Sequence, residues 1–207
     1  MNKQPVPLSV TVSELISWIF FPPLVATVFF VFLIFWYSAD FNQGLRWIVA
    51  ISPFLIFLPL LFFAVSYRLG WVSDIDFTDR RERPAFLFGF IASMAIAAAI
   101  SYFLHVPLKF FVYLFSGMVL LIELAIISLY WKISLHTAVT TSVLTAVVVL
   151  GGVAFAPLFL LIPVVVWARV LLKKHTVAQA IGGAVLAFIT TIIIFNIFGF
   201  YFLGTGL

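Results

Sequence analysis

Polar side chains are scarce in this chain, and nearly all that could do chemistry fall in the three short segments 73–84, 132–136 and 169–179. Together these segments supply several arginines, a lysine, a serine hydroxyl and two histidines. Guanidinium groups match phosphate oxygens in pairs. One histidine can attack phosphorus while a second protonates the leaving oxygen. The mixture predicts a site for a phosphate group, with no metal or other cofactor required, because the arginines can offset the negative charge.

Nine residues make up this candidate site, and each lies near the end of a long apolar run. They are Arg80, Arg81 and Arg83 in the first segment, Lys132, Ser134 and His136 in the second, and Arg169, His175 and Gln179 in the third. The second segment leads into one predicted helix, and the third leads into another. Helix N-termini offer unpaired N–H groups and the positive end of the helix dipole to an anion.

Membrane-spanning helices are the elements that must position these residues. Of the 207 residues, 65% are hydrophobic and 9% are charged, and 26 are phenylalanine; soluble domains carry about 25% charged residues. Only helices and closed barrels satisfy their backbone groups in lipid, and barrel strands alternate apolar and polar residues, whereas these apolar runs are unbroken. The sequence predicts an all-α polytopic bundle of about six to seven spans, forming one domain over residues 1–207.

Apolar runs of about 20 residues locate the individual crossings. The predicted spans are 12–37, 46–67, 85–104, 107–130, 135–154, 157–172 and 177–202, and Pro22-Pro23 is expected to bend or divide the first of them. Counting crossings puts the three polar segments at the same membrane face. Gly182-Gly183 is expected to permit close helix contact near the site. Glu123, in the middle of the predicted span 107–130, is expected to be protonated or paired, and is a candidate for a proton path.

The basic residues are unevenly distributed between the two faces. Nine of the 11 lysines and arginines fall on the side of the polar segments, and only Arg46 and Lys109 fall on the other. Five of the nine are themselves site candidates, which leaves four against two. By the positive-inside rule the site face is cytoplasmic, in a multi-pass protein of a bacterial inner membrane. The net charge of +4 points to anionic ligands and not to nucleic acid. No oligomeric state follows from the sequence.

The three segments resemble the type 2 phosphatidic acid phosphatase superfamily of membrane lipid phosphatases. That family has the motifs Lys-x6-Arg-Pro, Pro-Ser-Gly-His and Ser-Arg-x5-His-x3-Asp. Here Arg83-Pro84 matches the end of the first, Ser134-Leu135-His136 the second, and Arg169 with His175 the third. The resemblance implies hydrolysis of a lipid phosphomonoester or pyrophosphate, such as phosphatidic acid, phosphatidylglycerophosphate or a polyprenyl phosphate, through a phosphohistidine. It implies that His175 is the nucleophile and His136 the general acid, with Arg83, Arg169 and Ser134 on the phosphate.

The chain departs from the family pattern at two charged positions. Asp76 stands where the lysine of the first motif is expected, so Arg80, Arg81 or Lys132 would have to supply that charge. Gln179 replaces the aspartate that orients the nucleophile. An amide can orient a histidine but does not raise its basicity as a carboxylate does. These departures predict slow chemistry or none.

Two alternatives follow from the same residues. The first is a non-catalytic relative that binds or transports an anionic lipid or a small anion, which the two departures favour. The second starts from Asp74, Asp76 and Asp79, because such clusters hold Mg²⁺ on diphosphates and resemble the first motif of membrane prenyltransferases. That class needs a second acidic cluster, and the remaining acids, Glu14, Asp40, Glu82 and Glu123, form none.

Overall fold

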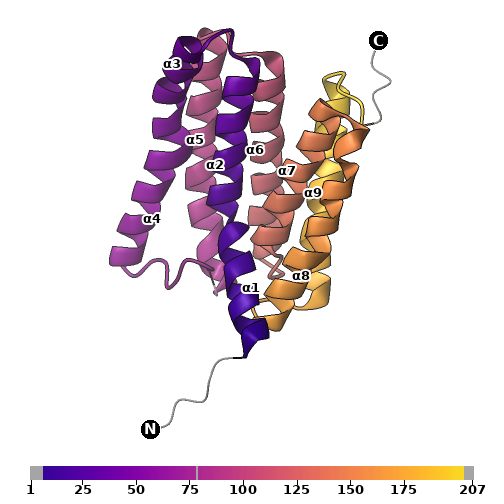
Figure 1. The fold of residues 1–207 in the computed structure, drawn as a ribbon. Helices are drawn as coiled ribbons and strands as arrows, with labels where there is room; N and C mark the ends of the chain where they lie inside the picture. Colours follow the sequence, from indigo (N-terminus) through magenta and orange to yellow (C-terminus); the bar gives the residue numbers. More distant parts are fainter. Residues whose placement is uncertain (1–6, 78, 203–207) are drawn as a thin grey trace.

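The proline pair breaks the first apolar run into two helices that meet at an angle. In the computed structural model, which describes residues 7–77 and 79–202, α1 (Leu8–Ile19) and α2 (Pro22–Tyr37) are bent by 44° at the break. Proline suits the first positions of a helix because its missing N–H would have no partner there. The bend predicted at Pro22-Pro23 is therefore confirmed, and it carries α1 outward beneath the rest of the molecule (Figure 1).

The second apolar run forms one long helical rod. It consists of α3 (Phe41–Ser52), a π-helical turn (Pro53–Phe57) and α4 (Leu58–Arg68). The side chain of Asp40 caps the start of α3 by accepting from the backbone N–H of Gln43 at 2.7 Å. After a loop and a short 3-10 turn (Arg80–Glu82), the chain returns through the bundle as α5 and then α6.

The remaining helices cross between the two ends of the bundle. They are α5 (Arg83–Phe103), α6 (Leu108–Ser128), α7 (Leu135–Gly151), a 3-10 segment (Val153–Leu160) that continues into α8 (Leu161–Leu171), and α9 (Val177–Ile197). Among the described residues, five helical segments are long and apolar enough to span a membrane, and six if the bent pair counts as one. The all-helical membrane bundle predicted from the sequence is confirmed.

The helix at the predicted fifth span, α7, is shorter than a full membrane crossing. α7 has 17 residues, which gives it a length of about 26 Å, less than the bilayer core of about 30 Å. It is also the central helix, with eleven of its residues buried and with α2, α6, α8 and α9 packed around it. Its many threonines are tolerable there because neighbouring helices, not lipid, surround them; Thr145, for example, donates to the carbonyl of Thr141 at 2.7 Å.

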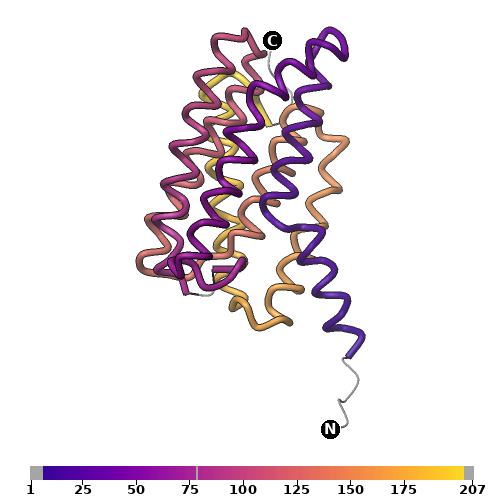
Figure 2. Tube along the Cα trace, turned by 90° about the vertical axis from the view of Figure 1, so that its left-hand side faces the viewer, coloured from indigo at the N-terminus to yellow at the C-terminus, as the bar shows by residue number. Residues whose placement is uncertain are grey.

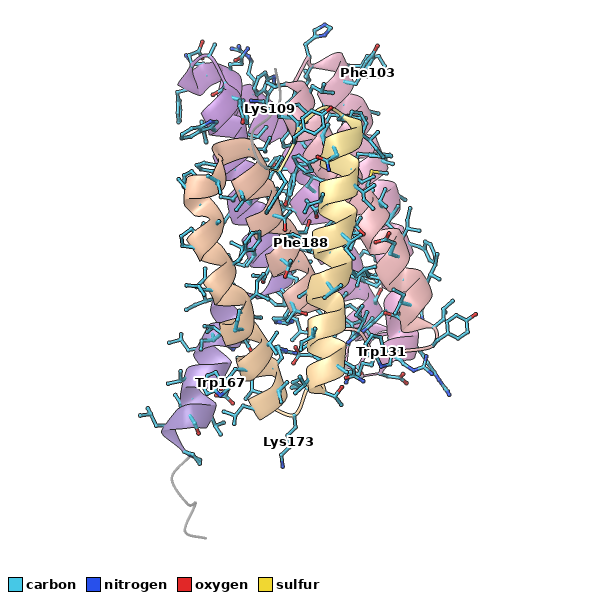
Figure 3. The ribbon with its side chains drawn as sticks, turned by 90° about the vertical axis from the view of Figure 1, so that its right-hand side faces the viewer. Phe103, Lys109, Trp131, Trp167, Lys173 and Phe188 are labelled. Carbon is cyan, nitrogen blue, oxygen red and sulfur yellow. The ribbon has the colours of Figure 1, made fainter. Side chains whose placement is uncertain are left out.

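Both ends of the bundle carry interfacial residues. Trp131, Trp167 and Lys173 lie near one end, and Phe103 and Lys109 lie near the other (Figure 3). Tryptophan and lysine at such positions are typical of the membrane–water boundary. The start of α1, the loop after α4, the α6–α7 connection and the α8–α9 turn all lie at the first of these ends (Figures 1 and 2). The three polar segments therefore meet at one face, as span counting predicts.

Candidate functional site

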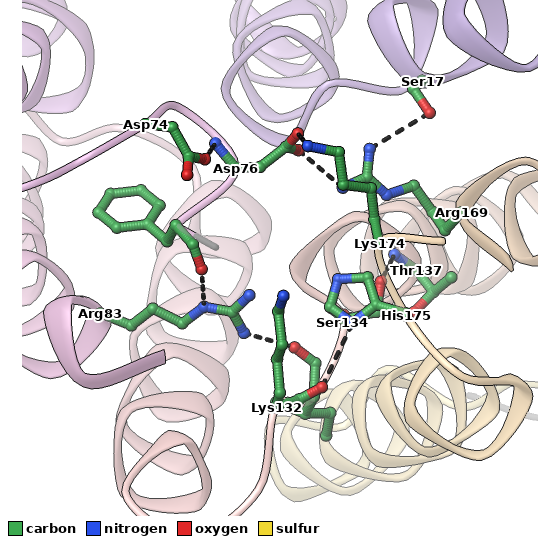
Figure 4. A network of polar contacts seen from close by, with 12 residues as sticks. Ser17, Asp74, Asp76, Arg83, Lys132, Ser134, Thr137, Arg169, Lys174 and His175 are labelled. Carbon is green, nitrogen blue, oxygen red and sulfur yellow. Dashed lines mark hydrogen bonds and ion pairs between the residues drawn. The ribbon is translucent and has the colours of Figure 1, made fainter. Parts of the chain in front are cut away.

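Asp76, Arg169 and Lys174 form the charged centre of the site (Figure 4). The Oδ1 atom of Asp76 lies 2.7 Å from Nη2 of Arg169, and Oδ2 lies 3.0 Å from Nζ of Lys174. Burial alone would raise the pKa of this carboxyl. The two cations outweigh that effect and lower the pKa of Asp76 to about 2. Asp76 is thus ionised at neutral pH and lies between two positive side chains.

Arg169 leaves part of its donor set unused. Its side chain projects from the last turn of α8, the residue is 2% exposed, and Nη1 donates to the hydroxyl of Ser17 on α1 at 3.3 Å. Its Nε is buried and has no hydrogen-bond partner among the described residues. A buried guanidinium N–H without a partner is costly, so this atom marks a place where a ligand oxygen would be stabilised.

Arg83 lies on the opposite side of the site at the start of α5, and is 1% exposed. It donates from Nη1 to the carbonyl of Ile133 at 2.6 Å and from Nε to the carbonyl of Phe77 at 3.3 Å. Phe77 has a left-handed backbone (φ 49°), and its ring packs 4.9 Å from that of Phe86. Arg83 thereby joins the first polar segment to the second.

His175 is oriented by a backbone carbonyl and not by an acidic side chain. Its Nδ1 lies 3.3 Å from the carbonyl oxygen of Lys132. A carbonyl can only accept, so Nδ1 carries the proton and Nε2 of the neutral ring bears the lone pair. Burial and the positive charges of Arg169, Arg83 and Lys132 together lower the pKa of His175 to about 4. At neutral pH the imidazole is therefore uncharged, with Nε2 available as a nucleophile.

The second polar segment begins α7 inside the bundle. Ser134 caps the helix by accepting from the N–H of Thr137 at 3.4 Å, and Thr137 donates to the carbonyl of Ala180 on α9 at 2.8 Å. A Cβ on Gly183 would lie 2.6 Å from the carbonyl oxygen of Ser134. Only glycine permits this approach, as expected for the Gly182-Gly183 pair. The serine's hydroxyl therefore has an established structural role, whereas its predicted phosphate contact stays a prediction.

His136 follows in the first turn of α7 and is buried. Its imidazole interacts with the backbone of Ser17 and lies within electrostatic reach of Arg169, Asp76 and His175. Its ring lies 6.1 Å from that of Phe21. The two histidines predicted to act together thus face the same buried charges, from α7 and from the α8–α9 turn.

Gln179 does not orient His175 as the sequence interpretation proposed. Its side-chain Oε1 accepts from the backbone N–H of Thr176 at 3.1 Å, and the Thr176 hydroxyl accepts from the N–H of Gln179 at 3.3 Å. These reciprocal bonds form a capping box at the start of α9. Gln179 stands at the third helical position, where such a residue reaches back to the cap.

Replacing Gln179 by alanine is therefore expected to affect stability and not chemistry. The loss of one capping-box bond should lower the free energy of unfolding by about 1 kcal/mol, with the rate of phosphate release per folded molecule unchanged. Thermal unfolding in detergent and phosphate release can be measured on the same preparation. A large drop in rate at unchanged stability would restore Gln179 to the catalytic set.

The other predicted phosphate ligands lie in different surroundings. Arg80 donates to the carbonyls of Ser128 and Leu129 at the end of α6, where a cation complements the helix dipole. This contact gives Arg80 a structural role, and its predicted phosphate contact stays a prediction. Arg81 is exposed, and its role stays a prediction. The side chain of Lys132 lies beside the cluster (Figure 4), where burial lowers the pKa of its ammonium and the charges of Arg83 and Lys174 add to this effect.

Three contributors were not predicted as site residues. Lys174 follows Lys173, and a lysine pair at a helix end is typical of a membrane flank. Ser17 belongs to an unremarkable apolar helix. The sequence interpretation of Asp76 is a departure from a motif or a metal ligand. The signal that points to its pairing is its charge, because a carboxylate that becomes buried beside several basic residues requires a cationic partner.

Acidic and histidine side chains do not converge in threes anywhere in the described part of the chain. Asp76 is paired with cations, which disfavours the magnesium-dependent alternative. Glu123, in the membrane interior, accepts from the hydroxyl of Thr190 at 2.6 Å. This contact pairs Glu123 inside the bundle and joins α6 to α9. Its predicted part in a proton path stays a prediction.

The pKa of His175 predicts a loss of stability in acid. The folded protein has a pKa of about 4 at His175, below the ordinary 6.5, so between these pH values the unfolded chain binds a proton that the folded protein does not. Stability should fall from pH 6.5 towards 4, by up to about 3 kcal/mol from this group. Asp76, with a pKa of about 2 instead of 3.8, adds a further loss only below pH 3.8.

Unfolding curves from pH 8 to pH 4 for the wild type and for His175→Gln check this prediction. Because His136 and His105 remain in both proteins, the difference between the curves isolates His175. The variant should lose less stability than the wild type over this range. Parallel curves would contradict the assignment.

Neither a scan against protein-family models nor searches of curated proteins and of solved structures gave a match to this chain. Its function is therefore inferred from the geometry of the site.

Proposed function

We propose that this chain is a membrane phosphatase that hydrolyses a lipid phosphate without a metal ion. The observation that carries the proposal is the pairing of an attacking group with an anion-binding group. His175 has its proton directed to the carbonyl of Lys132, which leaves a lone pair on Nε2, and the nearby Arg169 has a buried Nε without a partner in the described residues. Nucleophile and anion-binding donor thus belong to one buried cluster.

The proposed reaction proceeds in two steps. Nε2 of His175 attacks phosphorus, a bond from nitrogen to phosphorus forms, and the bond from phosphorus to the lipid oxygen breaks. His136 transfers a proton to that oxygen, since an anion beside it favours its protonated form. Water then gives a proton to the deprotonated His136 and attacks phosphorus, and the nitrogen–phosphorus bond breaks, which releases inorganic phosphate and restores both histidines. Arg83, Arg169 and Lys132 would stabilise the equatorial oxygens throughout.

A lipid substrate suits the location of the site. The cluster lies at one end of a bundle whose helices are apolar enough to cross a membrane. Trp131 and Trp167 lie near the same end (Figure 3). The headgroup phosphate of a membrane lipid would reach this end of the bundle without the lipid leaving the bilayer. Phosphatidic acid, phosphatidylglycerophosphate and polyprenyl phosphates carry the required group. The excess of basic residues at this face supports an orientation towards the cytoplasm in a bacterial inner membrane.

Phosphate release from these three lipid classes in mixed micelles, with and without EDTA, tests the function. We expect release from at least one lipid, unchanged by EDTA. Transient labelling of the protein by substrate phosphate, stable in alkali and labile in acid, would identify the phosphohistidine. The absence of release from every lipid phosphate, with wild type and His175→Gln behaving identically, would refute catalysis.

A second candidate function is binding or transport of an anionic lipid or small anion without turnover. It is favoured by the neutral partner of His175, because a carbonyl does not stabilise the charged imidazole as a carboxylate does. This function predicts stabilisation of the protein by inorganic phosphate with no release from lipid phosphates. The release assay and a thermal shift with phosphate, done together, separate the two functions.

A further inference from the structure

Asp76 takes up cationic groups that an incoming anion would need. Its two carboxylate oxygens pair separately with Arg169, at 2.7 Å, and with Lys174, at 3.0 Å. A phosphate group binds guanidinium and ammonium groups through the same contacts. The carboxylate of Asp76 therefore already accepts from the hydrogen-bond donors that an anionic ligand would use.

The loop around Asp76 is built to present this carboxylate. The backbone N–H of Asp76 donates to the side chain of Asp74 at 2.8 Å, which makes a local turn. The next residue, Phe77, is buried against the rings of Phe63 and Phe86, and its carbonyl accepts from Arg83. Asp76 is thus held between a turn and a packed aromatic anchor, and its pairing with Arg169 does not depend on a freely moving loop.

We propose that Asp76 is a tethered competitor of the anionic ligand and sets the affinity and charge balance of the site. This inference rests on the anion site of the proposed function. Four cations, Arg83, Lys132, Arg169 and Lys174, surround the site, and Asp76 offsets one of their charges. A ligand phosphate must displace the carboxylate from Arg169 or share the guanidinium with it. Asp76 is therefore a specificity-determining residue that keeps weakly charged anions out of a strongly basic site.

The competition has a measurable consequence. When only a fraction of molecules has the binding groups free, the apparent dissociation constant is raised by the inverse of that fraction. Removing the carboxylate frees Arg169 and Lys174 in every molecule. Asp76→Asn should therefore bind inorganic phosphate more tightly than the wild type, by about tenfold if the pair is formed nine-tenths of the time.

Thermal unfolding of the full-length protein in detergent, titrated with inorganic phosphate at neutral pH, measures this effect. Asp79→Asn is the matched control. It removes the same charge from the same loop, but the exposed Asp79 caps the 3-10 turn by accepting from the N–H of Arg81, and the amide oxygen of asparagine keeps that cap. We expect a lower melting temperature and a lower dissociation constant for Asp76→Asn, and wild-type affinity for Asp79→Asn.

The outcomes separate this inference from the proposed function. If wild type and Asp76→Asn both bind phosphate but the variant binds no more tightly, the competitor role is wrong and the anion site stands. Equal gains in phosphate affinity for Asp76→Asn and Asp79→Asn would show that the effect comes from the net charge of the loop, and would also refute that role. If neither protein binds phosphate, the anion site itself fails. Should Asp76→Asn unfold in phosphate-free buffer, excess phosphate must restore the folded protein, and failure to do so overturns the inference.

Discussion

Replacing His175 by glutamine is expected to reduce phosphate release from the lipid substrate by about 10³-fold or more. Removing a nucleophile leaves only the contribution of binding and charge stabilisation, and in other hydrolases such losses reach about 10⁶. The fold should survive, because the glutamine amide can donate to the carbonyl of Lys132 that now accepts from Nδ1 of His175. Initial rates and melting temperatures measured on the same preparation distinguish lost chemistry from lost structure.

His105→Asn is the matched control for this experiment. His105 lies in the α5–α6 connection, at the opposite end of the bundle, with a left-handed φ of 51°. Asparagine tolerates that conformation better than most residues do, so the substitution removes an imidazole without adding strain. The control should retain wild-type activity. Wild-type rates in His175→Gln would eliminate the phosphohistidine mechanism, even if the protein still binds phosphate.

Replacing Arg169 by methionine is expected to lower both stability and phosphate affinity. The substitution breaks a buried ion pair and leaves Asp76 without its principal partner. Losing one member of such a pair costs about 3–5 kcal/mol when the other stays buried. Because the Asp76 side chain is 20% exposed and keeps Lys174, we expect the lower part of that range. Phosphate affinity should fall by about 100-fold, through the loss of charge-assisted hydrogen bonds worth about 1.5–3 kcal/mol each.

The double variant Arg169→Met with Asp76→Asn separates the two effects. Removing the carboxylate that the first substitution leaves unpaired should recover much of the stability. In the double variant, methionine and asparagine replace an arginine and an aspartate of similar size, so no buried charge is left without its partner. The double variant should recover at most the part of the phosphate affinity that the freed Lys174 supplies, because the guanidinium is still missing. Arg68→Met, at the exposed end of α4, controls for loss of positive charge at this face. A double variant that binds phosphate as tightly as the wild type would remove Arg169 from the site.

The helices of this protein could be predicted from its sequence, whereas the polar contacts between them could not. Long apolar runs must form helices in lipid, because no other open structure satisfies the backbone there. The bundle, the break at Pro22-Pro23 and the positions of the spans could therefore be predicted. The crossings also carry His136 and His175 to the same face, since each span reverses the direction of the chain. Among the described helices, α7 falls short of a full crossing, because it ends at Gly151 whereas the predicted span runs to residue 154.

The polar contacts could not be derived in this way, because they depend on distances of about 3 Å between loops that follow no periodic pattern. Gln179 and Arg80 had the right residue types for the site, yet each satisfies backbone groups at a helix end, of α9 and α6 respectively. The partner of His175 is the backbone carbonyl of Lys132, and every residue has such a carbonyl, so no residue type in the sequence indicates this bond. The amino-acid sequence alone determined a helical membrane bundle with basic residues and histidines at one face. Tertiary packing decided which of them meet, and it paired Asp76 with Arg169, because a buried charge is stable only beside its opposite.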